Sequence, residues 1–192
     1  MSRQTSRMLP LGTPAPRFAL PDTVTGRTVS IEDFSSSPAL LVAFISNHCP
    51  FVKHILDGFV TLARDLGRQG LAVVAICAND AKAYPEDAPP QMARIAAAKA
   101  FTFPYLHDES QQVAMAYQAA CTPDFFLFDR NRRLAYRGRF DGSTPGNRVP
   151  VTGQELRAAC EALLRGRPPP EEQTPSVGCS IKWKPGQNPQ WS

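Results

Sequence analysis

The sequence predicts an α/β fold built around a mixed β-sheet, and three observations lead to this class. Two short apolar runs, Ala39 to Ile45 and Leu71 to Cys77, have the composition of strands covered on both faces of a parallel sheet. A single stretch of helical periodicity separates them. A strand, a polar turn and a second strand follow between Asp124 and Phe140, which adds an antiparallel pair.

The first elements in chain order are an N-terminal hairpin and a β-α-β unit. Segments around Arg17 to Leu20 and Thr28 to Ile31 have strand character and are joined by a turn-forming segment. Apolar residues then recur at helical spacing from Val52 to Leu66, and Gly67 provides a stop. We therefore expect a hairpin laid on the sheet, then two parallel strands joined by a right-handed helical crossover.

In the middle of the chain, the sequence predicts an inserted α-β segment and a further helix. A helix is expected from Pro90 to Ala100, because proline suits the first helical turn, and Phe103 to His107 resembles a short strand. Asp108 and Gln111 have the spacing of a capping box, which predicts another helix as far as Ala120.

The last elements of the domain are a hairpin and a helix. The hairpin strands are expected at Asp124 to Asp129 and Leu134 to Phe140, and the alternation in the second strand predicts one exposed face. Thr152 and Glu155 have capping-box spacing before an apolar stripe, and Gly166 ends that helix.

The composition predicts one domain with extensions at both ends. With 192 residues and 43% hydrophobic content, the chain can bury one core. We expect a polar N-terminal segment over residues 1–12, a domain over residues 13–165 and an extended Pro-rich tail over residues 166–192, which holds Trp183 and Trp191.

Charge and hydropathy exclude several classes of function. The net charge is only +4 and the basic residues are scattered, which argues against a nucleic-acid partner. There is no run of eighteen apolar residues and the N-terminus lacks a secretory pattern, so we expect no membrane association and a cytoplasmic location. The five cysteines are irregularly spaced and do not form a disulfide framework.

Cys49 is the strongest candidate for a reactive residue, because it ends a buried strand and opens a helix. Pro50 suits the first helical turn, and the amide groups of Phe51 and Val52 are expected to point back toward the sulfur, where they favour the thiolate. Lys53 lies four residues on and adds positive charge on the same face. The sequence therefore predicts a nucleophilic thiol.

The chain resembles the thioredoxin fold, and within it the peroxiredoxin-like (AhpC/TSA) family, over roughly Thr13 to Arg165. The resemblance rests on the Cys-Pro-x-x-Lys segment at Cys49, on Thr-Pro-Asp-Phe from Thr122, and on Gly-Cys-Ser-Ile-Lys-Trp-Lys from Gly178. It implies a thioredoxin-like fold with a mixed central sheet, an N-terminal hairpin and an inserted α-β segment. It also implies that Pro123 is cis and lies near Cys49.

The match to the family motifs is partial. Thioredoxins have a second cysteine where this chain has Val52. Peroxiredoxins have Thr or Ser three residues before the cysteine, as Ser46 does here, and Pro seven residues before it, where this chain has Val42. By rough position, three residues are candidates for the arginine with which peroxiredoxins polarise peroxide: Arg130, Arg132 and Arg139.

These observations predict a thiol-dependent oxidoreductase. The Cys49 thiolate would attack either a peroxide oxygen or the sulfur of a disulfide, with peroxide slightly favoured. In this fold Cys121 would lie a short side-chain movement from Cys49, and Cys179 is a second candidate to resolve the oxidised thiol. Cys77 and Cys160 have the surroundings of core residues.

Five further residues have expected roles at this site. Ser46 could hydrogen-bond the thiolate, and Lys53 with the helix N-terminus would hold the negative charge on sulfur. Pro50, Thr122 and Pro123 would border the bound substrate, with Thr122 and Pro123 presenting backbone groups to it. No organic cofactor and no metal are expected. The expected partner is an external thiol reductant such as a thioredoxin. The sequence leaves open whether two copies of the chain form a homodimer.

Two alternatives remain at this stage. In one, Cys49, a second thiol and His48 or His54 hold copper or zinc as a soft-metal binding module. In the other, the protein is a redox sensor without turnover, whose tail docks or releases when Cys49 is oxidised, and Trp183 reports the change.

Overall fold

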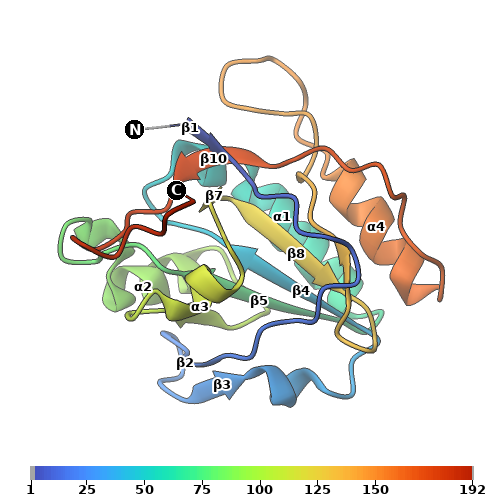
Figure 1. Cartoon of the computed structure of the whole chain (residues 1–192), viewed down its shortest axis with the longest axis horizontal. Coiled ribbons are helices and arrows are strands. Elements are labelled where there is room, and N and C mark those ends of the chain that lie inside the picture. The colour runs from blue at the N-terminus through green and yellow to red at the C-terminus, as the bar shows by residue number, and fades with distance from the viewer. Residues whose placement is uncertain (1–2, 192) are drawn as a thin grey trace.

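A computed structural model describes residues 3–191 and contains one central mixed sheet of five strands (Figure 1). Strand β4 pairs in parallel with β5 and antiparallel with β8, while β6 extends the parallel side and β9 the antiparallel side. The sheet therefore has the order β6-β5-β4-β8-β9. The strands are β4 (Ala39–Phe44), β5 (Leu71–Cys77), β6 (Tyr105–His107), β8 (Asp124–Phe128) and β9 (Leu134–Tyr136).

Helices cover both faces of this sheet because its buried strands present alternate residues to two cores. Leu41 and Ala43 of β4 pack in one core with α1 (Pro50–Gly67), α2 (Pro89–Ala98) and α4 (Gln154–Leu164). Leu40, Val42 and Phe44 pack in the other core with the region of α3 (Gln112–Ala116) and the N-terminal hairpin. The predicted α/β class with a mixed sheet is confirmed.

The expected N-terminal hairpin and β-α-β unit are also confirmed. Strand β2 (Ala19–Pro21) pairs antiparallel with β3 (Thr28–Ser30), and the short 3-10 helix η1 (Ile31–Phe34) follows. Helix α1 joins β4 to β5, and α2 with β6 forms the inserted α-β segment. A second 3-10 helix, η2 (Pro85–Asp87), precedes α2.

The predicted capping box before α3 is wrong. Gln111 has φ 63° and precedes a helix that ends at Ala116 rather than Ala120. Its side-chain amide donates to the carbonyls of Ala78 and Lys182, because the C-terminal segment passes over this loop. Asp108 still supports the helix, but it accepts the amide of Ala114 inside it.

The predicted start of α4 is wrong in a similar way. The N-cap is Gly153, with φ 64°, rather than Thr152. Both of their amides donate to the buried carboxylate of Asp141. Glu155 does not complete the predicted capping box, because it forms an ion pair with Arg139. Strand β9 also ends earlier than expected, at Tyr136.

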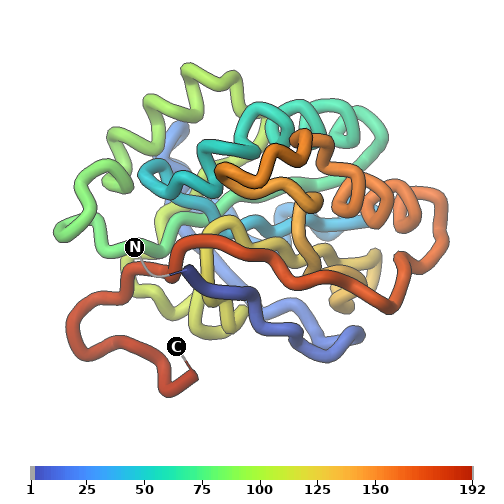
Figure 2. Tube along the Cα trace, turned by 90° about the horizontal axis from the view of Figure 1, so that it is seen from above, coloured from blue at the N-terminus to red at the C-terminus, as the bar shows by residue number. Residues whose placement is uncertain are grey.

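The two ends of the chain meet in a second, three-stranded sheet. Strand β10 (Val177–Ser180) lies antiparallel between β1 (Arg3–Thr5) and β7 (Cys121–Thr122), so the terminal segments run side by side (Figure 2). In this register Cys179 is paired with Arg3 on one side and with Thr122 on the other. The extended tail thus reaches the end of the central sheet at which α1 begins.

Beyond β10 the tail stays on the surface of the fold. Trp183 packs against the core that contains α3 and contacts Trp191 edge-on, with ring centroids 6.1 Å apart. The guanidinium of Arg7 lies 5.2 Å from the Trp191 ring. Among the helices in residues 3–191, none has the length and apolar character needed to span a bilayer.

Candidate active site

Cys49 is the N-cap of α1 and is completely buried. The apolar strand β4 delivers the chain to this point, and Pro50 starts the helix. The Cys49 thiol donates to the backbone carbonyl of Thr122 at 3.0 Å. The Thr122–Pro123 peptide bond is cis, and its proximity to Cys49 agrees with what the resemblance implied.

Cys179 is the nearest thiol partner of Cys49. It is buried in β10, and its thiol is hydrogen-bonded to the Cys49 sulfur. Burial, followed by the hydrogen bond and charge of Cys49, raises the pKa of Cys179 to about 12, although Lys182 and the Phe51 amide act in the opposite direction. The Phe51 amide is thus hydrogen-bonded to the sulfur of Cys179, whereas the sequence predicted that it would point toward the sulfur of Cys49.

Cys121 lies close by but on the other face of the small sheet. Residues opposite one another on paired strands share a face, and Cys121 pairs with Ser180 while Thr122 pairs with Cys179. Its thiol contacts the carbonyl of Pro123 at 3.5 Å. Burial first, then the charge of Asp124, raises the pKa of Cys121 well above its usual value.

Asp124 is a buried carboxyl group directly after the cis-proline. One oxygen accepts the amide of Ala120, and the other has no hydrogen-bond partner within residues 3–191. Burial raises the pKa of Asp124 to about 8, although three backbone amides act to lower it. The side chain therefore keeps its proton at neutral pH.

This burial predicts a pH-dependent stability that Asp124→Asn should remove. The unfolded carboxyl titrates near 3.9, so the folded state binds the proton more tightly, and its stabilising contribution is lost as the pH rises from about 4 to about 8. The wild-type free energy of unfolding should fall by a few kcal/mol relative to Asp124→Asn across this window. Urea unfolding at several pH values measures this difference.

The control for this experiment is Glu86→Gln, which removes an exposed carboxylate. Its stability should follow the wild-type pH curve. Parallel curves for the wild type and Asp124→Asn would contradict the assignment of a proton to Asp124.

Ser46 and His48 belong to a polar network behind the thiol pair. The Ser46 hydroxyl donates to the fully buried carboxylate of Asp87 at 3.1 Å, and Nδ1 of His48 lies 2.6 Å from the same carboxylate. Asp87 also accepts from the backbone amide of Asn47 and the side chain of Asn79. Ser46 is thus committed to Asp87 and His48 rather than to the Cys49 thiol.

The two histidines of this region each keep one nitrogen without a partner. Nε2 of His48 and Nε2 of His54 are buried and have no hydrogen-bond partner in the described part of the chain. The His48 ring stacks on Tyr84, with centroids 5.0 Å apart. No set of three His, Cys, Asp or Glu side chains in residues 3–191 is arranged to hold a metal ion, so the soft-metal alternative is not favoured.

Lys53 lies on the exposed side of α1. It borders a cavity of about 260 Å³ together with Lys99 and Phe101, whereas the Cys49 side chain is buried against Thr122 and Cys179. The Lys53 side chain therefore lies in different surroundings from the thiol whose charge it was expected to hold.

A groove of about 400 Å³ lies beside residues that neighbour the thiol pair in the chain or in the small sheet, although neither cysteine lines it. It is bordered by Phe51 of the first turn of α1, by Pro123, and by Arg3 and Arg139. Of the three arginines considered for peroxide binding, only Arg139 borders this groove. Its remaining lining residues are Ile55, Phe140, Asp141, Gly142, Ser143, Thr144, Asn147, Ser176 and Val177.

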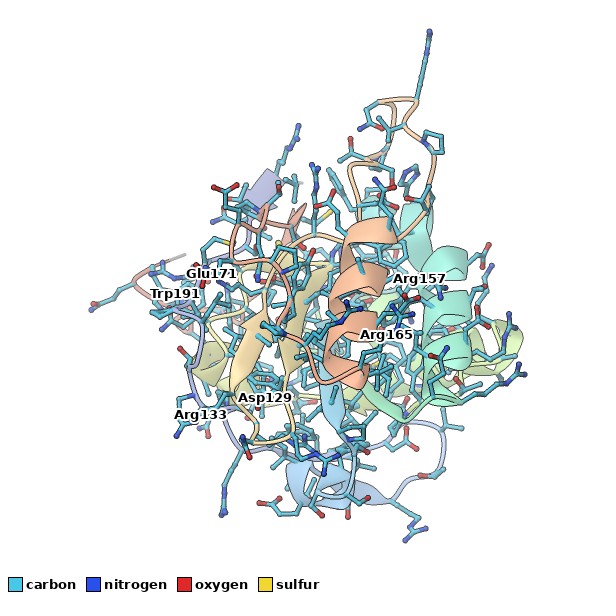
Figure 3. The ribbon with its side chains drawn as sticks, turned by 90° about the vertical axis from the view of Figure 1, so that its right-hand side faces the viewer. Asp129, Arg133, Arg157, Arg165, Glu171 and Trp191 are labelled. Atoms are coloured by element: carbon cyan, nitrogen blue, oxygen red, sulfur yellow. The ribbon has the colours of Figure 1, made fainter. Side chains whose placement is uncertain are left out.

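The other two arginines lie at the opposite end of strand β8. Arg130 borders a larger cavity of about 630 Å³, around which Asp129, Arg133 and Glu171 are labelled in Figure 3. Arg132 donates to the carbonyls of Phe34 and Ser37. Because Pro123 and Asp129 stand at the two ends of β8, this larger cavity is remote from the thiols.

Sequence reasoning missed two residues of the site. Asp87 follows Pro85 and Glu86, and nothing in this local sequence indicates that it is a site residue. Its burial depends on partners about forty residues away in the chain. Arg3 lies in the N-terminal segment that was interpreted only as polar. Its place beside the groove depends on the pairing of β1 with β10, which spans almost the whole chain.

Comparisons with known proteins show which family and which solved structures the chain is similar to. The model of the AhpC/TSA family matches residues 11–137. A crystal structure of an uncharacterized conserved protein from Geobacillus kaustophilus is 53% identical, with a TM-score of 0.95 and coverage of 97% of this chain and 98% of that chain. The hypothetical protein SMc02350 from Sinorhizobium meliloti 1021 is 52% identical, with a TM-score of 0.93 and coverage of 95% and 99%.

More distant structures share the fold. Peroxidoxin BcpB from Mycobacterium tuberculosis has a TM-score of 0.59 at 18% identity, with coverage of 81% of this chain and 96% of that chain. Similar thioredoxin-fold structures include thiol-disulfide oxidoreductases. The comparison with curated proteins gave no significant match.

Proposed function

Because the chain belongs to the AhpC/TSA family, whose membership supports a thiol-based redox function in general, we propose that it is a thiol-dependent peroxidase that uses Cys49 as its nucleophile. The observation that carries this proposal is the hydrogen-bonded pair of thiols, Cys49 and Cys179, at the N-terminus of α1 and beside Pro123. Two thiols in contact can exchange two electrons without a cofactor.

The proposed reaction cycle has three steps, which are oxidation of Cys49, disulfide formation and reduction. The Cys49 thiolate attacks the terminal oxygen of a hydroperoxide ROOH, and the O–O bond breaks to leave Cys49 sulfenic acid and ROH after protonation. The Cys179 sulfur then attacks the Cys49 sulfur, which forms a disulfide and releases water. An external dithiol such as a thioredoxin reduces the disulfide and is itself oxidised.

Cys179 is better placed than Cys121 to resolve the sulfenic acid. Its sulfur already contacts Cys49, whereas Cys121 lies on the other face of the small sheet. The Cys179 proton must leave during resolution. Burial and the neighbouring Cys49 raise the pKa of this thiol to about 12, and Lys182 and the Phe51 amide act in the opposite direction.

The burial of Cys49 supports a peroxide rather than a protein disulfide as the oxidising substrate. The side chain has no exposed surface. A small hydroperoxide needs only a local opening to reach it, whereas in-line attack on a protein disulfide needs a bulky partner to approach the sulfur. Pro123 and Arg139 border the neighbouring groove, and Arg139, which is also paired with Glu155, is our candidate among the three arginines to polarise the peroxide.

The test is a non-reducing peptide map of the reduced protein after one equivalent of hydrogen peroxide. We expect a disulfide between Cys49 and Cys179, and repeated cycles when a thioredoxin system is added. A Cys49–Cys121 disulfide would reject Cys179 as the resolving residue, and an unreacted Cys49 would reject the peroxidase. Oxidation without turnover under any reductant would favour the redox sensor.

A further inference from the structure

We propose that the groove beside the thiol pair binds an organic co-substrate that carries a carboxylate, and that Arg3 is the residue that binds this group. The inference rests on the proposed function and goes beyond it, because peroxidase chemistry by itself requires no charged substrate. It assigns a task to the N-terminal strand β1, which otherwise only extends the small sheet.

The strand register places Arg3 in one row with Cys179, the proposed resolving thiol. Arg3 pairs with Cys179, and Cys179 pairs with Thr122, across three antiparallel strands. Residues opposite one another in such strands have side chains on the same face, with Cβ atoms about 5 Å apart. The Arg3 side chain therefore leaves the sheet on the face on which Cys179 meets Cys49.

The size of the groove indicates an organic ligand. Its volume of about 400 Å³ is an order of magnitude above the roughly 30 Å³ that one water molecule occupies, and hydrogen peroxide is only slightly larger. Phe51, Ile55 and Val177 give it an apolar part, and Ser143, Thr144 and Asn147 give it a polar rim. This combination suits a ligand with a short carbon skeleton and a polar end.

The charges around the groove leave Arg3 as the available cation. Arg139 is held by Glu155, with Nη2 2.8 Å and Nε 2.9 Å from the same carboxylate oxygen. The carboxylate of Asp141 accepts from the Ser143 hydroxyl and from three backbone amides. The Arg3 guanidinium is exposed and has no ion pair with any residue in 3–191.

A second polar group in the same row lacks a partner. The hydroxyl of Thr122 is buried and makes no hydrogen bond within residues 3–191, although its backbone carbonyl holds the Cys49 thiol. A buried hydroxyl without a partner is costly to a fold and often marks a place for a ligand or water. Arg3 and Thr122 thus flank Cys179 in the small sheet, and of these two residues Arg3 is the one that lines the groove.

Two reactants of the cycle could carry the carboxylate. One is an organic hydroperoxide, which oxidises Cys49 to the sulfenic acid and leaves as the alcohol. The other is a low-molecular-weight thiol, two molecules of which reduce the Cys49–Cys179 disulfide and leave as their own disulfide. In both cases a charge-assisted, two-pronged contact with Arg3 would align the reacting atom with the sulfur.

The experiment compares matched charged and neutral reactants in both half-reactions. For oxidation, the reactants are cumene hydroperoxide and its para-carboxylate, and for reduction of the diamide-oxidised protein they are 3-mercaptopropionate and 3-mercaptopropionamide. The readout is the ratio of second-order rate constants, charged over neutral, followed by stopped-flow tryptophan fluorescence. We expect Arg3→Gln to lower this ratio about tenfold in one arm, and Arg3→Lys to restore part of it.

The matched control is Arg7→Gln, since Arg7 also lies near the N-terminus but contacts Gln118 and Trp191 rather than the groove. Its ratios should equal those of the wild type. A change in the oxidation arm identifies the hydroperoxide as the anionic reactant, and a change in the reduction arm identifies the thiol. Unchanged ratios for Arg3→Gln in both arms would overturn the inference, whereas failure of every peroxide to oxidise wild-type Cys49 would instead reject the proposed peroxidase.

Discussion

Cys49→Ser is expected to abolish peroxide turnover, with a loss on the order of 10³-fold or more, because a serine hydroxyl cannot form the sulfenic acid and burial raises the pKa of the one thiol in contact with it, Cys179. Serine keeps the hydroxyl donor for the Thr122 carbonyl, so the fold should survive the change. Coupled peroxidase turnover and a thermal melt of the same sample measure the two effects separately.

Cys160→Ala is the matched control for this substitution. It removes another buried thiol, on α4 and outside the proposed site, and should retain turnover with only a modest loss of stability. Cys179→Ser should stop the cycle one step later, with a persistent Cys49 sulfenic acid that dimedone labels. Full turnover by folded Cys49→Ser would contradict the assignment of Cys49 as the nucleophile.

Gly178→Ala is expected to detach β10 from β7 and to separate Cys179 from Cys49. A methyl group at position 178 would overlap the carbonyl carbon and oxygen of Thr122, and this obstacle is backbone that cannot rotate away. We expect the yield of the Cys49–Cys179 disulfide after one equivalent of peroxide to fall at least tenfold, and alkylation of Cys49 to become faster.

Gly67→Ala provides the comparison for this prediction, because a methyl group at position 67 in the last turn of α1 meets no atom within 4 Å. Its disulfide yield should match that of the wild type, and helix propensity predicts slightly higher stability. An unchanged disulfide yield in Gly178→Ala would show that close packing of β10 against Thr122 does not hold the thiols together.

Where the sequence predicted the fold correctly, the signal was local or was repeated over many residues. The apolar runs of β4 and β5, and the helical stripe of α1, are long enough to fix both the type and the order of the elements. The same reasoning failed at helix starts. Capping boxes at Asp108 and Thr152 were overridden because Gln111 bonds to the C-terminal segment and Glu155 pairs with Arg139.

In the candidate site too, the residues marked by a local pattern were predicted, and those that depend on long-range pairing were not. The sequence alone singled out Cys49, since a cysteine between a buried strand and a proline-led helix is a local pattern, and the family motif brought Thr122 and Pro123 to it. It could not choose between Cys121 and Cys179. That choice depends on which face of a two-residue strand each side chain occupies, and only the register with β10 determines this.

The α/β class, the order of the main elements and the position of the candidate nucleophile could thus be predicted from the sequence, because each depends on residues that are close together in the chain. Three features became visible only in the folded chain: Ser46 donates to Asp87, Lys53 lies apart from the thiol, and the chain termini bring Cys179 and Arg3 together. Pairing between strands almost the full chain length apart leaves no periodic pattern within either strand, so the sequence could not reveal the contact between the termini.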